Sequence, residues 1–282
     1  MEPINLLKPV IQAANAANAE KPGDFIKDGL LHCGACRTPK QCRNIILGRE
    51  VVAGCMCSCS EEKYNVEEAR RRQREETDRI MRLKNTGITS QKYRDASFEK
   101  DDRRNPEFMK KLRNYAENWE EIRRNNIGLL LYGDTGTGKS YGAACIANYL
   151  IERNVAVCMI NLSTVLNSLG GFQSEDKNTY IEDLMRYPLL ILDDLGMERQ
   201  TEYALEQVFN VIDARSRSGK PLIVTTNLSV ATIQNPQDLA HKRIYDRITE
   251  MCPAVILAAG PSRRKEKATE KAKIAAQILL GR

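Results

Sequence analysis

The chain has 282 residues, of which 42% are hydrophobic and 28% are charged, and its formal net charge is +6. This composition supports a buried core in one large domain or two modest ones and excludes a disordered chain, while the mild basicity permits nucleic-acid contact without showing it. Because no apolar run approaches the ~18 residues of a membrane span and the N-terminus lacks the features of a signal peptide, we expect a cytoplasmic protein that does not contact membranes.

Residues 1–60 are predicted to form a cysteine-rich, zinc-binding domain. Six of the nine cysteines lie in this segment, and disulfides are disfavoured inside cells, so the cluster indicates a metal site. A C-x-x-C knuckle and further thiols about twenty residues later resemble a zinc ribbon, in which four thiolates surround Zn²⁺ tetrahedrally. The favoured ligands are Cys33, Cys36, Cys57 and Cys59, with Cys55 as the leading substitute, Cys42 as a weaker candidate and His32 as a neighbour.

An iron–sulfur cluster on the same thiols is the alternative to zinc. The low apolar content of residues 1–60 also predicts that this segment needs its metal in order to fold. The other three cysteines, Cys145, Cys158 and Cys252, lie in apolar segments and are expected to be small buried hydrophobes.

Residues 61–87 are predicted to form an exposed helix that links two domains. Residues 61–85 are highly charged and contain neither Gly nor Pro, a composition typical of a solvated helix. The arginine run in this segment is interpreted as one face of that helix with opposite-charge pairs, and nucleic-acid contact is the alternative.

Residues 88–282 are predicted to form an α/β domain, because apolar strands alternate with longer helical stretches. Strands are predicted at residues 127–133, 155–161, 187–196, 221–227 and 254–260. Helices are predicted at residues 140–153, 162–171, 201–219 and 241–248. Continuous apolar runs such as LLIL favour a parallel sheet that helices cover on both faces. Residues 264–282 are expected to form an amphipathic helix packed on the domain surface.

The strand–loop–helix around residue 136 carries a complete G-x-x-x-x-G-K-[ST] motif. Glycines let such a loop curl so that its backbone N–H groups point at phosphates, and the following helix adds its positive N-terminal end. Lys139 can reach the β- and γ-phosphates, and the Ser140 hydroxyl is a Mg²⁺ ligand. We therefore predict that ATP with Mg²⁺ binds at Gly133, Asp134, Thr135, Gly136, Thr137, Gly138, Lys139 and Ser140.

Polar residues at the ends of two later strands complete the predicted hydrolysis site. Asp193 and Asp194 follow the apolar run of residues 189–192, at the edge of a parallel sheet where a P-loop also lies. Asp193 is the candidate for the Mg²⁺ shell and Asp194 for orienting or deprotonating the attacking water. Asn227 ends the fourth strand and is the candidate for contacting the γ-phosphate or that water. For all three residues, turn formation is the alternative.

Arg243 and Arg247 lie four residues apart, on one face of the predicted helix at 241–248. An arginine offered from this helix to the γ-phosphate of a neighbouring subunit would act as an arginine finger. Intramolecular ion pairing is the alternative explanation for both arginines.

The order P-loop, LLILDDLG, TTN and R-x-x-x-R resembles the AAA+ ATPases of the DnaC and DnaI type, which load replicative helicases, and their relatives, the IstB-type transposition helper ATPases. The similarity covers roughly residues 90–265, and DDLG and RIYDRI are more specific than the P-loop. The resemblance implies a AAA+ core that hydrolyses ATP slowly and assembles into a homo-oligomer with ATP. It places the arginine finger on Arg247 and a nucleotide-sensing Ser-x-Arg element on Arg264, for which Arg263 competes. About twenty residues follow Gly260, so little or no helical lid is expected, as in loaders of this type.

The resemblance also implies a function. Loaders of the DnaI type place a zinc-binding module before the ATPase, where it contacts the helicase, so residues 1–60 are expected to do the same. The leading hypothesis is a loader that delivers a replicative helicase onto single-stranded DNA in bacterial or phage DNA replication. An IstB-like transposition helper acting on duplex DNA is the main alternative, and a small-molecule kinase is a third. The cysteine-rich N-terminus favours the loader, because transposition helpers more often begin with a helical module and a kinase needs no zinc module.

Overall fold

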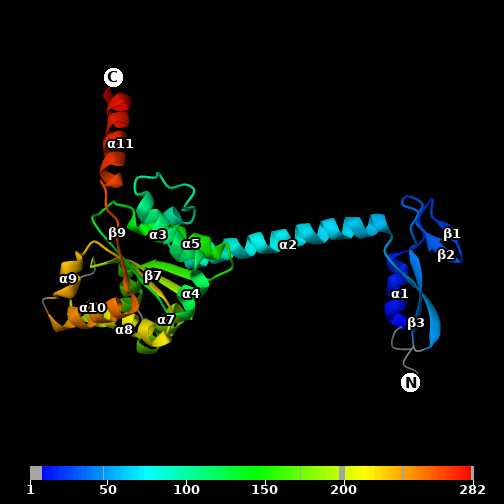
Figure 1. Cartoon of the computed structure of the whole chain (residues 1–282), viewed down its shortest axis with the longest axis horizontal. Helices are drawn as coiled ribbons and strands as arrows, with labels where there is room; N and C mark the ends of the chain where they lie inside the picture. The colour runs from blue at the N-terminus through cyan, green and yellow to red at the C-terminus, as the bar shows by residue number, and fades with distance from the viewer. Residues whose placement is uncertain (1–7, 47, 172, 197–200, 237, 281–282) are drawn as a thin grey trace. The chain divides into compact units, whose positions relative to one another are not determined.

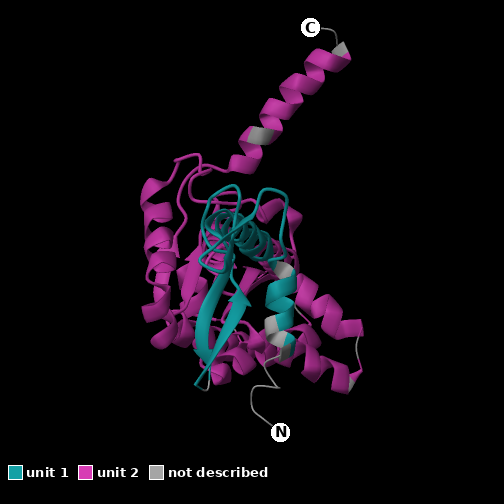
Figure 2. Cartoon of the chain, turned by 90° about the vertical axis from the view of Figure 1, so that its right-hand side faces the viewer, with its two compact units in different colours: residues 1–77 teal, residues 78–282 magenta. Residues whose placement is uncertain are grey.

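The computed structural model describes residues 8–280 except 47, 172, 197–200 and 237. The chain divides into two compact units, residues 1–77 (unit 1) and residues 78–282 (unit 2), coloured separately in Figure 2. The division falls inside the 30-residue helix α2 (Ser58–Gly87), which Figure 1 shows in cyan. Most of its side chains are exposed, and Glu68 pairs with Arg71 and Arg72 one turn later. The charged segment is therefore helical, and its role as a link between two domains stays a prediction.

No helix in the described part of the chain combines the length and the apolar character needed to cross a membrane.

Unit 1 contains one short helix and two antiparallel hairpins before α2. These elements are α1 (Lys8–Ala17), β1 (Phe25–Lys27), β2 (Leu30–His32), β3 (Gln41–Ile46) and β4 (Arg49–Gly54). The β1–β2 turn has positive φ at both Asp28 and Gly29, the residue types that tolerate this conformation in a two-residue hairpin. A buried ion pair between Lys40 Nζ and Asp24 Oδ2, 2.6 Å apart, lowers the pKa of Asp24 to about 2 and joins the two hairpins.

Unit 2 is built on a five-stranded parallel sheet, as the sequence predicted. Its strands, in spatial order, are β6 (Val157–Asn161), β7 (Leu189–Leu195), β8 (Leu222–Thr226), β5 (Leu129–Tyr132) and β9 (Ala254–Leu257). The helical elements are η2 (Gln91–Tyr93), α3 (Pro106–Glu117), α4 (Trp119–Arg124), α5 (Lys139–Ile151), α6 (Leu162–Gly171), α7 (Ser174–Arg186), α8 (Glu202–Ser218), α9 (Val230–Gln234), α10 (Leu239–Met251) and α11 (Arg263–Leu280).

Each central strand supplies two hydrophobic cores, one on each face of the sheet. Leu129 and Leu131 of β5 pack into a core with α3 and α5, whereas Leu130 packs into a second core with α6, α8 and α10. Side chains alternate between the faces of a strand, so an unbroken apolar run is what a sheet covered on both faces requires. The polar ends of these strands are thereby left at one edge, where the P-loop lies.

The buried Arg215 of α8 holds two strands that carry site residues. Its side chain is fully buried and donates hydrogen bonds to the carbonyl oxygens of Tyr187, Pro188 and Pro221. Burial lowers its pKa to about 10. Because these carbonyls precede β7 and β8, the guanidinium sets the relative position of the two strands at their beginnings, and hence of the residues at their ends.

Helix α11 differs from the expectation. From Arg264 onward, every side chain that the structure describes in this helix is exposed, including Ile274, Ile278 and Leu279. The expected packing of this helix on the domain surface is therefore wrong for the isolated chain. Its apolar residues are diluted by lysines and alanines, and together they present too little continuous apolar surface to hold the helix against the core.

Candidate nucleotide site and cysteine cluster

The P-loop curls between the end of β5 and the start of α5. Gly136 and Gly138 both have positive φ, and a Cβ on Gly136 would lie 2.2 Å from Ser262 Oγ. These positions therefore favour glycine, because a side chain would be strained at both and would collide with Ser262 at position 136. The loop leads directly into α5, so its backbone N–H groups and the N-terminal end of that helix face one cavity.

Lys139 lies at the centre of the site. Its ammonium donates hydrogen bonds to the carbonyl oxygens of Gly133 at 2.7 Å and Asp134 at 2.8 Å, and to Oδ1 of Asn227 at 2.8 Å. Its burial lowers its pKa, and the nearby Asp194 and Asp193 oppose that shift. An ammonium has three donors. Lys139 must therefore release at least one of these hydrogen bonds to bind a phosphate. Among its three partners, Asn227 is the one that contributes a side chain.

Asp193 is buried beside Ser140, the second residue of α5. Its Oδ1 accepts a hydrogen bond from Thr225 Oγ1 at 2.6 Å, and it also interacts with the Ser140 hydroxyl. Burial raises its pKa, and these two hydrogen bonds lower it in part. A hydroxyl and a carboxylate placed together in this way provide the oxygen ligands that Mg²⁺ prefers. The donor set of Ser140 and Asp193 therefore fits the predicted magnesium ion.

A bulge in β7 brings the second carboxylate to the same side as the first. Neighbouring residues of a regular strand point to opposite faces, yet both Asp193 and Asp194 act on Lys139. Asp194 has a φ of 63°, and the pairing of β7 with β8 shifts register at this point. Thr225 Oγ1 accepts the Asp194 N–H at 3.0 Å, and Asn161 Nδ2 donates to Asp194 Oδ2 at 3.1 Å. These contacts stabilise a backbone conformation that costs about 1–2 kcal/mol in a non-glycine residue.

A cavity of about 300 Å³ lies over the P-loop. Asp194, Asn227, Arg263 and Arg264 line it together with P-loop residues. Five further lining residues were not predicted from the sequence: Lys92, Tyr93, Lys100 and Asp102, from η2 and the segment after it, and Tyr141 of α5. One signal was available: Asn148 and Tyr141 are polar residues on the apolar helix α5, and they bond Tyr93 O and Ser97 O of that segment.

Both arginines of the Ser-x-Arg element reach this cavity. The N–H of Arg263 donates to Gly136 O at 3.0 Å, and its guanidinium pairs with Asp102. Arg264 is exposed, lines the same cavity and lowers the pKa of Lys139 by its charge. The structure thus brings the favoured Arg264 and its competitor Arg263 to the nucleotide site.

Arg247 lies elsewhere, on the exposed face of α10. Its guanidinium is 3.1 Å from Glu250 Oε2 and 3.5 Å from Asp213 Oδ1, and it does not line the cavity. Arg243 of the same helix is also exposed. Within one chain, Arg247 therefore makes ion pairs, and its role toward a neighbouring subunit stays a prediction.

Four cysteine thiols converge in unit 1. The Sγ atoms of Cys33, Cys36, Cys57 and Cys59 all lie within 4.8 Å of one another, with Cys33–Cys59 at 3.6 Å and Cys57–Cys59 at 3.4 Å. A tetrahedron with Zn–S bonds of about 2.3 Å has sulfur atoms about 3.8 Å apart. The donor set fits zinc. Cys55, the predicted substitute ligand, lies outside this group, and its thiol is 3.7 Å from Pro39 O.

The thiols of the four-thiol group differ widely in pKa. Hydrogen bonds from Thr38 and from the Cys59 N–H lower the pKa of Cys36 to about 5. Hydrogen bonds to Cys57, Cys36 and Cys33 raise the pKa of Cys59 to about 12. Removing every proton from the group therefore requires a cation to balance the accumulating charge, and this is what a bound divalent metal supplies.

The family model for IstB-like ATP-binding proteins matches residues 60–271. The chain belongs to this family. The predicted resemblance is thereby confirmed, and the P-loop, the acidic pair and Arg247 all lie within the matched residues. The four-thiol group lies wholly before them.

Curated relatives of the chain include replicative helicase loaders. It is 27% identical over 143 residues to the replicative helicase loader DnaC of Escherichia coli K12, which is 50% of this chain and 56% of that protein. It is 27% identical over 144 residues to DnaC of Buchnera aphidicola subsp. Schizaphis graminum, with the same coverage. The chain thus spans about half the length of the curated relatives it matches.

Two solved structures show the same fold. The crystal structure of DnaI superposes with a TM-score of 0.53 at 23% identity and covers 64% of this chain and 99% of that one. The crystal structure of the DnaC helicase loader gives 0.51 at 21% identity and covers 60% and 99%. Unit 2 therefore shares its α/β fold with these DnaI and DnaC structures, as the sequence predicted.

Proposed function

We propose that this member of the IstB-like family is an ATP-dependent loader that places a replicative helicase on single-stranded DNA. The similarity of its ATPase unit to the DnaC loaders carries this proposal. The P-loop and the carboxylates at the sheet edge support it, because they supply groups for binding ATP with Mg²⁺ and for orienting the attacking water. We further propose that ATP promotes assembly of several copies of the chain.

The residues of the nucleotide site have distinct proposed roles. Lys139 neutralises the β- and γ-phosphates, while Ser140 and Asp193 hold the Mg²⁺ that bridges them. Asp194 is half-buried, lines the cavity and orients the attacking water. Asn227 bonds Lys139 and so couples the end of β8 to the phosphates. Arg264 senses the nucleotide from the start of α11.

Replacing Asp194 with asparagine is expected to separate ATP binding from hydrolysis. The amide keeps the hydrogen bond to Asn161 through its oxygen and leaves the phosphate cradle intact, but it cannot accept a proton from water. ATP affinity should stay within about threefold of wild type while the turnover rate falls by about 10²-fold or more. Equilibrium binding and steady-state phosphate release measure the two quantities. Normal turnover would make Asp194 a turn residue only.

We propose that Cys33, Cys36, Cys57 and Cys59 bind one Zn²⁺ and that the resulting module contacts the helicase. Among the described residues of unit 1, the buried side chains are few: Leu31, His32, Cys33, Lys40 and Cys57. Such a small core needs a further source of stability, and a structural zinc ion provides it.

Purified protein is expected to contain about one zinc per chain, as elemental analysis will measure. Cys57→Ser should lose this metal and unfold unit 1, which circular dichroism and limited proteolysis will detect. Cys42→Ser is the matched control, because Cys42 lies in the same unit but outside the four-thiol group. If the protein instead contains iron and shows a visible absorbance band, the iron–sulfur alternative is correct.

The second candidate function is that of an IstB-like transposition helper, because the chain belongs to the IstB-like family. Both functions use the same ATPase unit, so unit 1 and the nucleic-acid substrate discriminate between them. A helper of this kind acts on duplex DNA, whereas a loader acts on single strands and requires the helicase.

The test mixes the full-length chain with the replicative helicase of its own host and a circular single-stranded DNA. We expect helicase to be retained on the circle only with the chain and ATP, and not with Lys139→Ala. We also expect Cys57→Ser to lose the complex with helicase. Failure to bind the helicase, together with ATP-dependent assembly on duplex DNA, would favour the transposition helper instead.

A further inference from the structure

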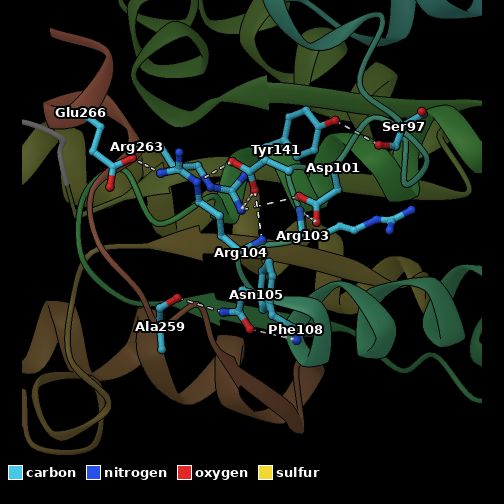
Figure 3. A network of polar contacts seen from close by, with 11 residues as sticks. Ser97, Asp101, Arg103, Arg104, Asn105, Phe108, Tyr141, Ala259, Arg263 and Glu266 are labelled. Atoms are coloured by element: carbon cyan, nitrogen blue, oxygen red, sulfur yellow. Dashed lines mark hydrogen bonds and ion pairs between the residues drawn. The ribbon is translucent and has the colours of Figure 1, made fainter. Parts of the chain in front are cut away.

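An acidic pair holds one of the two arginines at the start of α11, beside the nucleotide cavity. Nη2 of Arg263 lies 3.0 Å from Asp102 Oδ1 and 3.5 Å from Asp101 Oδ1. Figure 3 shows Arg263 and Asp101 within this network of polar contacts. Both carboxylates belong to residues 94–105, which connect η2 to α3, and we name this stretch the connecting segment. The ion pairs therefore join two parts of the chain that are distant in sequence, and both Asp102 and Arg263 line the cavity.

Arg263 also lies against the P-loop. Its backbone N–H bonds Gly136 O, and a Cβ on Gly138 would lie 3.2 Å from its guanidinium carbon. Its side chain is 18% exposed and lines the cavity. The guanidinium thus has carboxylates on one side and, on the other, the loop whose N–H groups are shaped to receive phosphates.

We propose that Asp101 and Asp102 compete with the nucleotide phosphates for Arg263, and that ATP binding exchanges these ion pairs for an arginine–phosphate contact. A guanidinium uses the same forked donors for a carboxylate and for a phosphate, so the two anions exclude each other. ATP competes better than ADP because its additional phosphate brings more negative charge. The inference rests on ATP binding at the P-loop and adds a nucleotide-dependent switch to that site.

Asp101 turns this exchange into a conformational change. Its side chain is 6% exposed, and among the described residues its Oδ1 has no hydrogen-bond partner and relies on the ion pair with Arg263. A buried carboxylate without a partner is costly, so Asp101 must move toward water when Arg263 turns to phosphate. Its Oδ2 accepts the Arg103 N–H at 3.0 Å. Movement of Asp101 therefore breaks this turn and loosens the connecting segment.

The end of the connecting segment transmits the movement to α11. Arg104 pairs with Glu266 of α11, and Asn105 Nδ2 donates to Ala259 O at 2.9 Å; Figure 3 shows both contacts. A change in the turn at residues 101–103 acts directly on these neighbours. Helix α11 is consequently the element whose position follows the state of the nucleotide.

The test measures the affinities of full-length variants for MgATP and MgADP. Asp102→Asn keeps the size of the side chain and its acceptor for the Arg104 N–H but removes the competing charge. We expect MgATP to bind roughly fivefold more tightly, the size of effect expected of a partly exposed ion pair, and MgADP to change by less than twofold. In an Arg263→Gln background, the same substitution should change MgATP affinity by less than twofold.

Glu99→Gln is the matched control, because it removes the same charge from the same segment but from an ion pair with Arg113, 2.7 Å long. It should leave MgATP affinity within twofold of wild type. Hydrogen exchange gives the second readout: MgATP should accelerate exchange at residues 99–105 in wild type and not in Arg263→Gln. An unchanged affinity in Asp102→Asn, a gain that persists without Arg263, or unchanged exchange would overturn the inference. Failure of the wild type to bind MgATP would instead overturn the proposed nucleotide site.

Discussion

Replacing Lys139 with alanine is expected to weaken MgATP binding by about 100-fold or more while the chain stays folded. The ammonium is the charged donor nearest the phosphate cradle, and hydrogen bonds to charged groups contribute about 1.5–3 kcal/mol each. Loss of two phosphate contacts therefore accounts for the expected effect. The carbonyl oxygens of Gly133 and Asp134 lose their partner as well, but Gly133 is only half-buried and Asp134 is exposed, so water can replace the ammonium.

Titration calorimetry measures the affinity, and a thermal melt checks the fold. Lys111→Ala is the control, because Lys111 is an exposed lysine of α3 that does not line the cavity. Its removal tests whether net charge alone controls ATP binding. An Lys139→Ala protein that melts like wild type and binds MgATP with unchanged affinity would refute the nucleotide site.

The sheet of unit 2 was predictable because its strands are continuous apolar runs. Residues such as Leu189–Leu192 must face two cores, and few other structures bury every residue of a run that short. The P-loop was equally predictable, since the motif occurs between a strand and a helix. Both signals are local, and each is complete within about ten residues.

The relation between Asp193 and Asp194 was not predictable in the same way. Alternation along a strand sends neighbours to opposite faces, and only the bulge in β7 brings both carboxylates to Lys139. At that bulge the hydroxyl of Thr225, which comes from a different strand, bonds both Asp193 and Asp194. A contact between two residues that are distant in sequence produces no periodic pattern in a single sequence.

The lining of the cavity by residues 92–102 was missed for a related reason. The segment has no regular structure beyond the short η2, so no hydrophobic period marks it. Its position results from single hydrogen bonds, such as Asn148 to Tyr93 O, and from the ion pairs of Asp101 and Asp102. Among these, only the buried Asn148 on an apolar helix was a visible anomaly.

In unit 1, the spacing of the cysteines limited the leading candidate metal ligands to five, but it did not separate Cys55 from the four whose thiols converge. The structure supplies the reason. The Cys55 N–H bonds Lys40 O at 2.8 Å, so Cys55 continues the pairing of β3 with β4, whereas Cys57 lies in the turn that starts α2. The position of the Cys55 thiol is consequently set by the register between β3 and β4, which the spacing of the cysteines in the sequence does not reveal.

Replacing Arg247 with alanine is expected to lower the ATPase rate of assembled protein by about 10²-fold or more, although this residue lies outside its own nucleotide cavity. Arginine fingers contribute about 10³–10⁵ in rate in well-measured NTPases, because they neutralise charge that develops on the γ-phosphate. In one chain, Arg247 pairs with Glu250 and Asp213 and is 44% exposed. Exposed pairs of this kind contribute less than about 1 kcal/mol. A neighbouring phosphate can therefore displace them, and their loss should not unfold the chain.

Mixing Arg247→Ala with Lys139→Ala is the decisive measurement for action between subunits. Each variant alone should be nearly inactive, but in mixed assemblies an intact P-loop from one chain meets an intact arginine from its neighbour, so activity should return in part. The specific activity of wild type should also rise with protein concentration. Arg243→Ala is the matched control on the same exposed helix and should cost much less. If Arg247→Ala hydrolyses ATP as fast as wild type at every protein concentration, Arg247 acts only through its ion pairs with Glu250 and Asp213.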